Sequence, residues 1–482
     1  MRKNRILFVL LLLIAVFGMV TMQTGHVWGD DFAMYLMHAR NIAEGHTYDQ
    51  TGYIYNDLAP AYAPQSYPPG FPLLIAPVYA IFGYDFMPYK IFILLLFLVW
   101  LVVIYRYLRD KMPELYALAV IAILGFNPFL WEMRNSILSD IPAALFFTLA
   151  IVLTEKAFTG NKITDWIIAG CVIYFSYAIR STGIVLLPAA VIAGLFYKNT
   201  RRLKLLIPVI VFFLLIPVQS LLFHQEGSYF TIIANTLTGD GAAGIADQVR
   251  QFSVWYFDSF KDFFIGSYHN LFTNSVLFYA GFSAATLGFI FSLRKKVTTA
   301  EIAVVLYVGV ILLWPAFQGF RFFVPLMPLY LLYIVVALQQ IKKEKIGRIA
   351  ASAFMVLMIA VYISYYITAD YGTPKYNIEA SENKEVFNYI RSTTEDHALI
   401  MSEKPRAFCL ETGRRGIVFP DPAYADSLQS CIRENNVEFI ATSKFNLITN
   451  YPMKEILSDH EHFQLVYENK AGYLFRVNRV TF

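Results

Sequence analysis

The sequence predicts a mainly α-helical membrane protein, a polytopic bundle of about eleven transmembrane helices followed by a small extracytoplasmic α/β domain. Of the 482 residues, 57% are hydrophobic and only 15% are charged, and the mean hydropathy is +0.50. Soluble domains carry about 25% charged residues. The apolar residues form runs near the length of roughly 20 residues that crosses the hydrocarbon core of a bilayer. Short basic clusters separate these runs.

Eleven apolar runs are the expected spans. The first follows a basic N-terminus, and we expect it to be an uncleaved helix, because no small-residue cleavage site comes after it. The short pair at 164–197 is the weakest assignment. The runs cover residues 6–23, 90–108, 115–131, 138–156, 164–179, 183–197, 203–223, 273–293, 300–315, 321–340 and 347–366.

The loops between the runs indicate which side of the membrane each one faces. Each predicted cytoplasmic loop holds two to four Lys or Arg residues, whereas the longer outside segments before residue 367 hold few. This alternation follows the positive-inside rule. It requires that 164–179 and 183–197 be two separate helices. We therefore expect a multi-pass protein of a plasma membrane, the inner one in a bacterium, with a cytoplasmic N-terminus and an extracytoplasmic C-terminal domain.

The sequence predicts two domains. Residues 1–368 form the membrane domain, with outside loops at 24–89 and 224–271, and residues 369–482 form the outside α/β domain. In the second loop, apolar residues at helical spacing between 247 and 265 predict a helix that lies in the membrane interface or packs on its own protein. The C-terminal domain is expected to contain helices at 381–392 and 423–435, strands at 398–402 and 437–442, and a hairpin with arms 463–467 and 473–477.

Composition also limits the partners. The net charge of +4 is too small to indicate a nucleic-acid partner. The three cysteines, Cys171, Cys409 and Cys431, are too scattered for a metal site. Cys409 and Cys431 would pair only in an oxidising compartment, and we expect them unpaired. We expect no required cofactor; the gathered acidic groups leave a divalent metal open without supporting one.

The first candidate site residues follow directly after the first apolar run. Asp30 and Asp31 are adjacent carboxylates, and Asp31, Tyr35 and His38 recur at helical spacing, which places them on one face of a short helix. An acidic pair at a helix start can also serve only to cap that helix and complement its dipole. Taken alone, the pair leaves both interpretations open.

Other charged residues lie at predicted outer helix ends. Asp140 opens the fourth run in Ser139-Asp140-Ile141-Pro142, Arg180 follows the fifth, and Arg321 opens the tenth. Each of these residues, taken alone, could simply be a charged side chain at a helix end that reaches water. Together, carboxylates and arginines on one side of the membrane predict a site that deprotonates an acceptor and holds a phosphate.

These segments resemble the bacterial GT-C glycosyltransferases, most of all the protein mannosyltransferase and lipid A aminoarabinose transferase group. The resemblance covers the membrane part and depends on the order of short motifs. The motifs are the Asp30-Asp31 loop, Tyr67-Pro68-Pro69-Gly70-Phe71-Pro72 leading into Ile81-Phe82-Gly83, Ser139-Asp140-Ile141-Pro142, and the Arg-Phe-Phe-Val-Pro-Leu-Met-Pro stretch at 321–328.

The resemblance implies transfer of a sugar from a polyprenyl-phosphate carrier to a protein, lipid or glycan acceptor at the outer face of the bilayer. The catalytic base falls on the pair Asp30 and Asp31, where the family commonly has Asp-Glu four residues before a Tyr. Asp31 lies four residues before Tyr35, which favours Asp31 as the family's Asp. The alignment can also place that Asp at Asp30, with Asp31 in the position of the Glu. Asp140, Arg321, Arg180 and Tyr35 are the substrate-binding candidates, while Tyr67 is expected to shape its loop.

Two alternatives remain from the sequence. A transporter or lipid flippase would also suit eleven helices, although the predicted spans hold few charged residues and show no repeat. Another polyprenyl-linked enzyme, a glycan ligase or polymerase, is the second alternative. The sequence identifies neither the sugar nor the acceptor.

Overall fold

The computed structural model describes residues 2–59, 64–160, 162–197, 201–224, 241–264, 271–421, 428–444, 456 and 459–478. The chain divides into two compact units. Unit 1 is Met1–Met22, Pro88–Leu221 and Leu237–Tyr371, and unit 2 is Gln23–Met87, Leu222–Thr236 and Gly372–Phe482. The first outside loop, expected at 24–89 in the membrane domain, instead belongs to unit 2 together with the C-terminal region.

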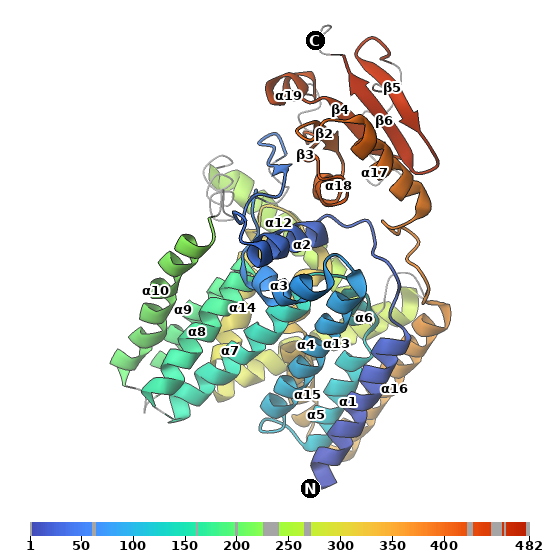
Figure 1. Cartoon of the computed structure of the whole chain (residues 1–482). Coiled ribbons are helices and arrows are strands. Elements are labelled where there is room, and N and C mark those ends of the chain that lie inside the picture. The colour runs from blue at the N-terminus through green and yellow to red at the C-terminus, as the bar shows by residue number, and fades with distance from the viewer. Residues whose placement is uncertain are drawn as a thin grey trace. The chain divides into compact units, whose positions relative to one another are not determined.

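Unit 1 is helical throughout its described residues (Figure 1). Its largest helix–helix contacts join α13 to α15 and α7 to α8. The elements are α1 (Arg2–Val20), α4 (Phe86–Leu108), α5 (Glu114–Gly125), α6 (Pro128–Arg134), α7 (Asp140–Gly160), α8 (Ile163–Ile179), η1 (Ser181–Val185), α9 (Leu186–Leu195), η2 (Arg202–Leu205), α10 (Leu206–Leu222), α12 (Gly241–Ser259), η3 (Phe260–Phe263), α13 (Leu271–Lys295), α14 (Thr299–Leu312), η4 (Gly319–Leu326), α15 (Met327–Gln339) and α16 (Glu344–Thr368).

Six helices among the described residues are long and apolar enough to cross a membrane, and a bent pair raises the number to seven. The expected runs at 164–179, 183–197 and 300–315 coincide with apolar helices of 10–17 residues, and the run at 6–23 coincides with the apolar stretch Arg5–Val20 of α1, which is also shorter than the six. Six or seven spans are therefore supported, and the count of eleven is not confirmed. The six are Phe86–Leu108, Asp140–Gly160, Arg202–Leu222, Ser275–Lys295, Gly319–Gln339 and Lys345–Thr368.

The bent pair occupies the run expected at 115–131. Helices α5 and α6 meet at an angle of 56°. Asn127 caps α6 by accepting a hydrogen bond from the Leu130 N–H at 3.0 Å, and Pro128 has no N–H with which to continue α5. The sequence therefore ends one helix and begins another inside a single apolar run.

The helix expected within 247–265 packs on its own unit along its predicted apolar stripe. Phe252, Tyr256 and Phe260 are buried, while Val254 and Trp255 on the remaining surface are exposed. The Tyr256 hydroxyl accepts a hydrogen bond from the Gln318 N–H at 3.4 Å. Residues 225–240 and 265–270 of the expected second loop lie outside the described residues.

Unit 2 is built around a six-stranded sheet of order β1-β3-β2-β4-β6-β5 (Figure 1). The strands from β1 to β4 pair in parallel, and β6 and β5 add an antiparallel hairpin. The helix expected at 423–435 is described only from Leu428, because 422–427 lie outside the described residues. The elements are α2 (Asp31–Glu44), β1 (Tyr53–Ile54), α3 (Gly70–Phe82), α17 (Ser381–Thr393), β2 (Leu399–Ser402), α18 (Pro405–Thr412), β3 (Arg415–Val418), α19 (Leu428–Asn435), β4 (Phe439–Ser443), β5 (Phe463–Glu468) and β6 (Gly472–Val477).

The first loop contributes an edge strand to this sheet. In the pairing of β1 with β3, Tyr53 lies opposite Gly416. The Asn56 side chain donates a hydrogen bond to the Val418 carbonyl at 2.9 Å, and it is buried there. Backbone pairing with the C-terminal strands therefore explains why the loop belongs to unit 2.

We predict that Gly288→Val disrupts unit 1. A Cβ atom at Gly288 in α13 would lie 1.8 Å from the Tyr333 carbonyl oxygen in α15, so the helices would have to separate. Small residues permit such close approach in membrane proteins. We expect a destabilisation of about 3 kcal/mol, measured as the thermal unfolding midpoint of the purified protein in detergent.

The matched control is Gly309→Val in α14, where a Cβ atom would meet nothing within 4 Å. Both changes put the same β-branched residue in a helix, so the intrinsic propensity cost is shared. Equal midpoints for the two variants would contradict the prediction.

Candidate active site

The acidic pair begins α2, and its two carboxylates make different contacts. Asp30 stands at the N-cap of α2 but makes no side-chain cap bond to that helix. Its Oδ1 instead accepts hydrogen bonds from the backbone N–H groups of Arg406 and Ala407, at 2.9 and 3.1 Å. Backbone N–H groups in the first turn of a helix have no partner within that helix. Asp30 therefore caps α18, more than 370 residues further along the chain.

Asp31 is the more accessible carboxylate of the pair. Its side chain is 29% exposed, against 6% for Asp30. Its Oδ1 accepts a hydrogen bond from the Tyr67 hydroxyl at 2.6 Å. The same hydroxyl oxygen accepts from Arg406 Nη1 at 2.7 Å. Tyr67 thus links the guanidinium to Asp31 and holds this carboxylate in place while leaving part of it open.

Arg406 is the buried cation of the cluster, and its side chain is only 2% exposed. Nη1 lies 3.5 Å from Asp30 Oδ2 and 3.8 Å from Asp31 Oδ1. The guanidinium carbon also lies over the rings of Tyr53 and Tyr67, 4.5 and 5.0 Å from their centroids. A buried cation needs such partners, because removing it from water costs several kcal/mol.

Asp31, Tyr35 and His38, the residues predicted to share one face of α2, all contact Tyr67. Asp31 accepts the Tyr67 hydroxyl, the ring of Tyr35 lies 5.0 Å from the Tyr67 ring, and His38 Nε2 accepts the Tyr67 backbone N–H at 3.1 Å. Tyr35 also packs against Phe71 and is buried. Tyr67 therefore both shapes its loop and contacts the candidate base.

Burial shifts the pKa of two of these groups. His38 is enclosed by protein, and desolvation lowers its pKa to about 3, so the ring is neutral near pH 7. Because Nε2 accepts a hydrogen bond, Nδ1 carries the proton and donates it to the Tyr48 carbonyl at 2.8 Å. Burial also raises the pKa of Asp30, an effect that Arg406 and Lys404 oppose.

Arg406 is not among the site residues predicted from the sequence. No chemistry is predicted for the C-terminal domain, yet this domain supplies the guanidinium at the acidic pair. A weak signal exists, since Arg406 follows shortly after the strand expected at 398–402. Residues at the carboxyl ends of parallel strands commonly line sites in α/β sheets.

Unit 1 contains a second charged cluster, formed by three of the predicted site residues. Asp140 Oδ1 accepts hydrogen bonds from Arg180 Nη1 at 2.8 Å and Arg321 Nε at 3.2 Å, and Asp140 Oδ2 accepts from Arg321 Nη2 at 3.0 Å. Arg321 thus holds the carboxylate through two parallel bonds, the strong arrangement for this pair. The structure brings these three residues together from α7, the C-terminal end of α8, and η4.

Among the described residues, this cluster contains one carboxylate and two guanidinium groups. One carboxylate, 1% exposed, faces two guanidinium groups, of which Arg180 is 11% and Arg321 20% exposed. The Arg180 guanidinium also lies over the Phe322 ring, 4.7 Å from its centroid. Partly exposed arginines fixed in position can bind an additional anion, such as a phosphate.

In the parts of the chain that the structure describes, no group of three or more His, Cys, Asp or Glu side chains could hold a metal ion. The three cysteines are free thiols. Burial raises the pKa of the Cys409 thiol, which makes it a poor nucleophile.

Comparisons with known proteins identify the fold. Residues 66–223 match the family model described as dolichyl-phosphate-mannose-protein mannosyltransferase. The Archaeoglobus fulgidus oligosaccharyltransferase, solved with Zn and sulfate, gives a TM-score of 0.62 at 12% identity, covering 98% of this chain and 73% of that one. ArnT from Cupriavidus metallidurans, solved with undecaprenyl phosphate, gives 0.58 at 11% identity, covering 97% of each chain.

Mycobacterial arabinofuranosyltransferase AftD gives a TM-score of 0.55 at 11% identity, and this chain covers 42% of it. No curated protein matches the chain. All three solved relatives are GT-C glycosyltransferases, so the fold is of the GT-C type and the resemblance seen in the sequence is confirmed.

We predict that Asp140→Ala destabilises unit 1 by about 3–5 kcal/mol, because it leaves two guanidinium groups side by side without their carboxylate. The thermal unfolding midpoint of the purified protein in detergent measures the effect. Asp247→Ala is the control: this aspartate pairs at 3.4 Å with Arg250, and the two side chains are 75% and 80% exposed. Such a pair contributes about 1 kcal/mol or less, so similar losses in both variants would contradict the prediction.

Proposed function

Because the chain has the fold of the GT-C membrane glycosyltransferases, we propose that it transfers a sugar from a polyprenyl-phosphate carrier to an acceptor at the extracytoplasmic face of a plasma membrane. The observation that carries the proposal is the partly exposed Asp31 carboxylate, held by Tyr67 beside a buried ion pair. The charge asymmetry of the loops supports the outward orientation.

A polyprenyl-phosphate donor is supported by two observations. The similar ArnT structure is bound to undecaprenyl phosphate. In unit 1, the Asp140–Arg180–Arg321 cluster holds two partly exposed guanidinium groups, and guanidinium groups bind phosphate oxygens well. We assign Arg321 and Arg180 to this phosphate and Asp140 to the positioning of both arginines.

Asp31 is the base that we propose within the acidic pair. Asp30 is buried, and its Oδ1 is already bonded to two N–H groups of α18. Asp31 retains an exposed fraction of 29%, so an acceptor hydroxyl or amide can reach it. A base must come within hydrogen-bond reach of the proton it removes. The more exposed Asp31 meets this requirement better than the buried Asp30.

The reaction is a displacement at the anomeric carbon. Asp31 takes the proton of the acceptor nucleophile, and the nucleophile's electron pair forms the new bond to that carbon. The bond from the anomeric carbon to the phosphate oxygen breaks, and polyprenyl phosphate leaves with the electron pair as an anion that the arginines stabilise. A single displacement inverts the anomeric configuration, and no carboxylate nucleophile is needed.

The acceptor class is a protein, a lipid or a glycan. A structure of the similar archaeal oligosaccharyltransferase is tethered to an acceptor peptide, which supports a protein acceptor, while the resemblance seen in the sequence leaves lipid and glycan acceptors open. The sugar is likewise unassigned. Comparing the sugar composition of envelope lipids, glycans and secreted proteins with and without the gene would identify both.

We predict that Asp31→Asn lowers the transfer rate by about 10²–10⁴-fold, the usual contribution of a general base. Asp30→Asn is the matched variant. The amide oxygen that replaces the Asp30 carboxylate can still accept the two α18 hydrogen bonds, so we expect a loss of about tenfold or less. The measurement is transfer of a radiolabelled sugar from polyprenyl phosphate by purified protein, with thermal unfolding as the check on folding.

A larger rate loss at position 30 than at position 31, in folded protein, would move the base to Asp30. Full activity in both variants would exclude the pair from catalysis.

We predict that Arg321→Gln raises the KM for the lipid-linked donor by about tenfold or more, because it removes a charged hydrogen-bond donor from the phosphate. Asp140 keeps its bond to Arg180, so the protein should remain folded. Donor titration at saturating acceptor measures the effect. An unchanged donor KM would exclude Arg321 from phosphate binding.

A further inference from the structure

Helix α3 leaves large apolar side chains on the surface of unit 2. Its sequence, Gly70–Phe82, contains no charged residue. One side of the helix packs on α2 and buries Phe71 and Ile75 completely, while Leu73 and Ile81 are 42% and 74% exposed. A helix that is apolar on every side requires apolar surroundings on every side. Helix α2 supplies them for one side, and the described residues leave the other side open.

The exposed residues of α3 form one stripe. Leu73, Pro77 and Ile81 follow one another at intervals of four residues, so they lie on the same face of the helix, and all three are exposed. Phe82, at the end of the helix, is 52% exposed. Leu95 in the membrane-spanning helix α4 is 55% exposed. The stripe on α3 is therefore as open to its surroundings as a side chain that faces lipid.

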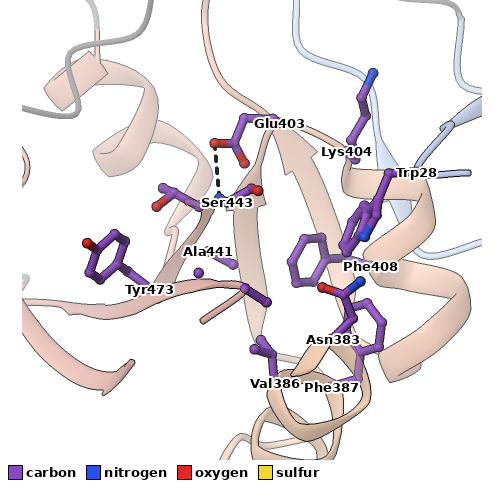
Figure 2. A pocket seen from close by; sticks show the side chains of 13 residues that line it. Trp28, Asn383, Val386, Phe387, Glu403, Lys404, Phe408, Ala441, Ser443 and Tyr473 are labelled. Carbon is purple, nitrogen blue, oxygen red and sulfur yellow. Dashed lines mark hydrogen bonds between the residues drawn. The ribbon is translucent and has the colours of Figure 1, made fainter. Parts of the chain in front are cut away.

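The C-terminal part of unit 2 does not share this property. Among the described residues from 372 to 478, the exposed large hydrophobic side chains are Tyr376 and Leu465. Two of its phenylalanines pack inward. Figure 2 shows Phe387 and Phe408 near a small pocket, where their ring centroids lie 5.5 Å apart and the side chains are 1% and 7% exposed. The apolar surface is therefore a local property of α3.

The chain itself keeps α3 close to the bilayer. Gly83, Tyr84 and Asp85 are the residues between α3 and α4, and α4 is long and apolar enough to cross a membrane. Because an extended chain advances at most about 3.5 Å per residue, the end of α3 lies within about 14 Å of the start of α4. The loop charges make this the outer end of α4.

The length of α3 excludes a span and suits the bilayer surface. Its 13 residues rise about 20 Å, which is shorter than the hydrocarbon core of about 30 Å. Tyr79 and Tyr84 pack with ring centroids 5.1 Å apart at the end that leads into α4. Tyrosine is enriched at the level of the lipid head groups. A short apolar helix with tyrosines at the end nearest the span fits a helix that lies along the interface.

We propose that α3 lies in the outer leaflet of the membrane and buries Leu73, Pro77 and Ile81 among the acyl chains. The partner is the lipid surface, and the uncharged stripe needs no particular head group. Tyr67, just before α3, donates its hydrogen bond to Asp31 at 2.6 Å. The anchor thus fixes the height of Asp31 above the bilayer. This last step rests on the proposed function, since a lipid-linked donor presents its phosphate at the bilayer surface.

Spin labels measure whether this face contacts lipid. Leu73→Cys and Leu465→Cys are a matched pair, because the two leucines are 42% and 44% exposed. Both are made in the full chain with Cys171→Ser, while the buried Cys409 and Cys431 stay. The labelled proteins are placed singly in nanodiscs of dioleoylphosphatidylcholine. Oxygen concentrates in lipid and a nickel chelate stays in water, so we expect nickel relaxation to be lost at position 73 and kept at 465.

A label at Leu95→Cys in α4 gives the lipid reference, and position 73 should match it. Nickel relaxation at position 73 equal to that at 465 would overturn the proposal. Protection of position 73 from both oxygen and nickel would overturn it as well, because protein would then cover the stripe. These outcomes do not depend on the transfer reaction.

A second experiment tests the role of the anchor in transfer. Because a carboxylate is disfavoured among acyl chains, we expect Leu73→Asp to lower transfer from membrane-embedded polyprenyl-phosphate sugar by about tenfold. Transfer from a short-chain, water-soluble donor should not change, and Leu465→Asp should affect neither donor. An equal loss with both donors would contradict the anchoring role. Lipid contact at position 73 in a protein that transfers no sugar would contradict the proposed function alone.

Discussion

The structure of unit 2 depends on the neutralisation of one buried cation, the guanidinium of Arg406. Its partners come from three parts of the first loop: the acidic pair before and in α2, Tyr53 in β1, and Tyr67 before α3. Burying an arginine without such partners would cost several kcal/mol. The first loop and the C-terminal strands are therefore expected to fold as one unit, although they lie at opposite ends of the chain.

This interaction also explains how adjacent carboxylates take different roles. Neighbouring residues at a helix start point in directions about 100° apart, so one carboxylate can face α18 while the other faces Tyr67. Asp30 satisfies backbone N–H groups that are otherwise unpaired, and it contributes stability. Asp31 makes no such cap contact with α18, and its side chain keeps an exposed fraction of 29%. The capping interpretation therefore applies to Asp30, while the proposed catalytic role falls on Asp31.

Features that depend on residues close together in the sequence, such as helix periodicity and apolar runs, could be predicted from the sequence. The face of Asp31, Tyr35 and His38 follows from helical periodicity, and the structure has it. The apolar runs all coincide with helices, but run length alone does not show that Asn127 and Pro128 bend one of them or that four are short. Strand β1 has two residues and α18 has eight, so neither gives a readable pattern. Arg406 escapes sequence analysis because its partners are more than 330 residues away in the chain.

Among the described residues, the two charged clusters have opposite compositions. In unit 2 two carboxylates face the guanidinium of Arg406. In unit 1 two guanidinium groups face the carboxylate of Asp140. In each cluster the single opposite charge fixes the other two in position before substrate arrives, and preorganised charge is the most effective form of electrostatic catalysis. In the proposed phosphate site, Asp140 is therefore as important as the arginines it holds, because without it their mutual repulsion would move both guanidinium groups.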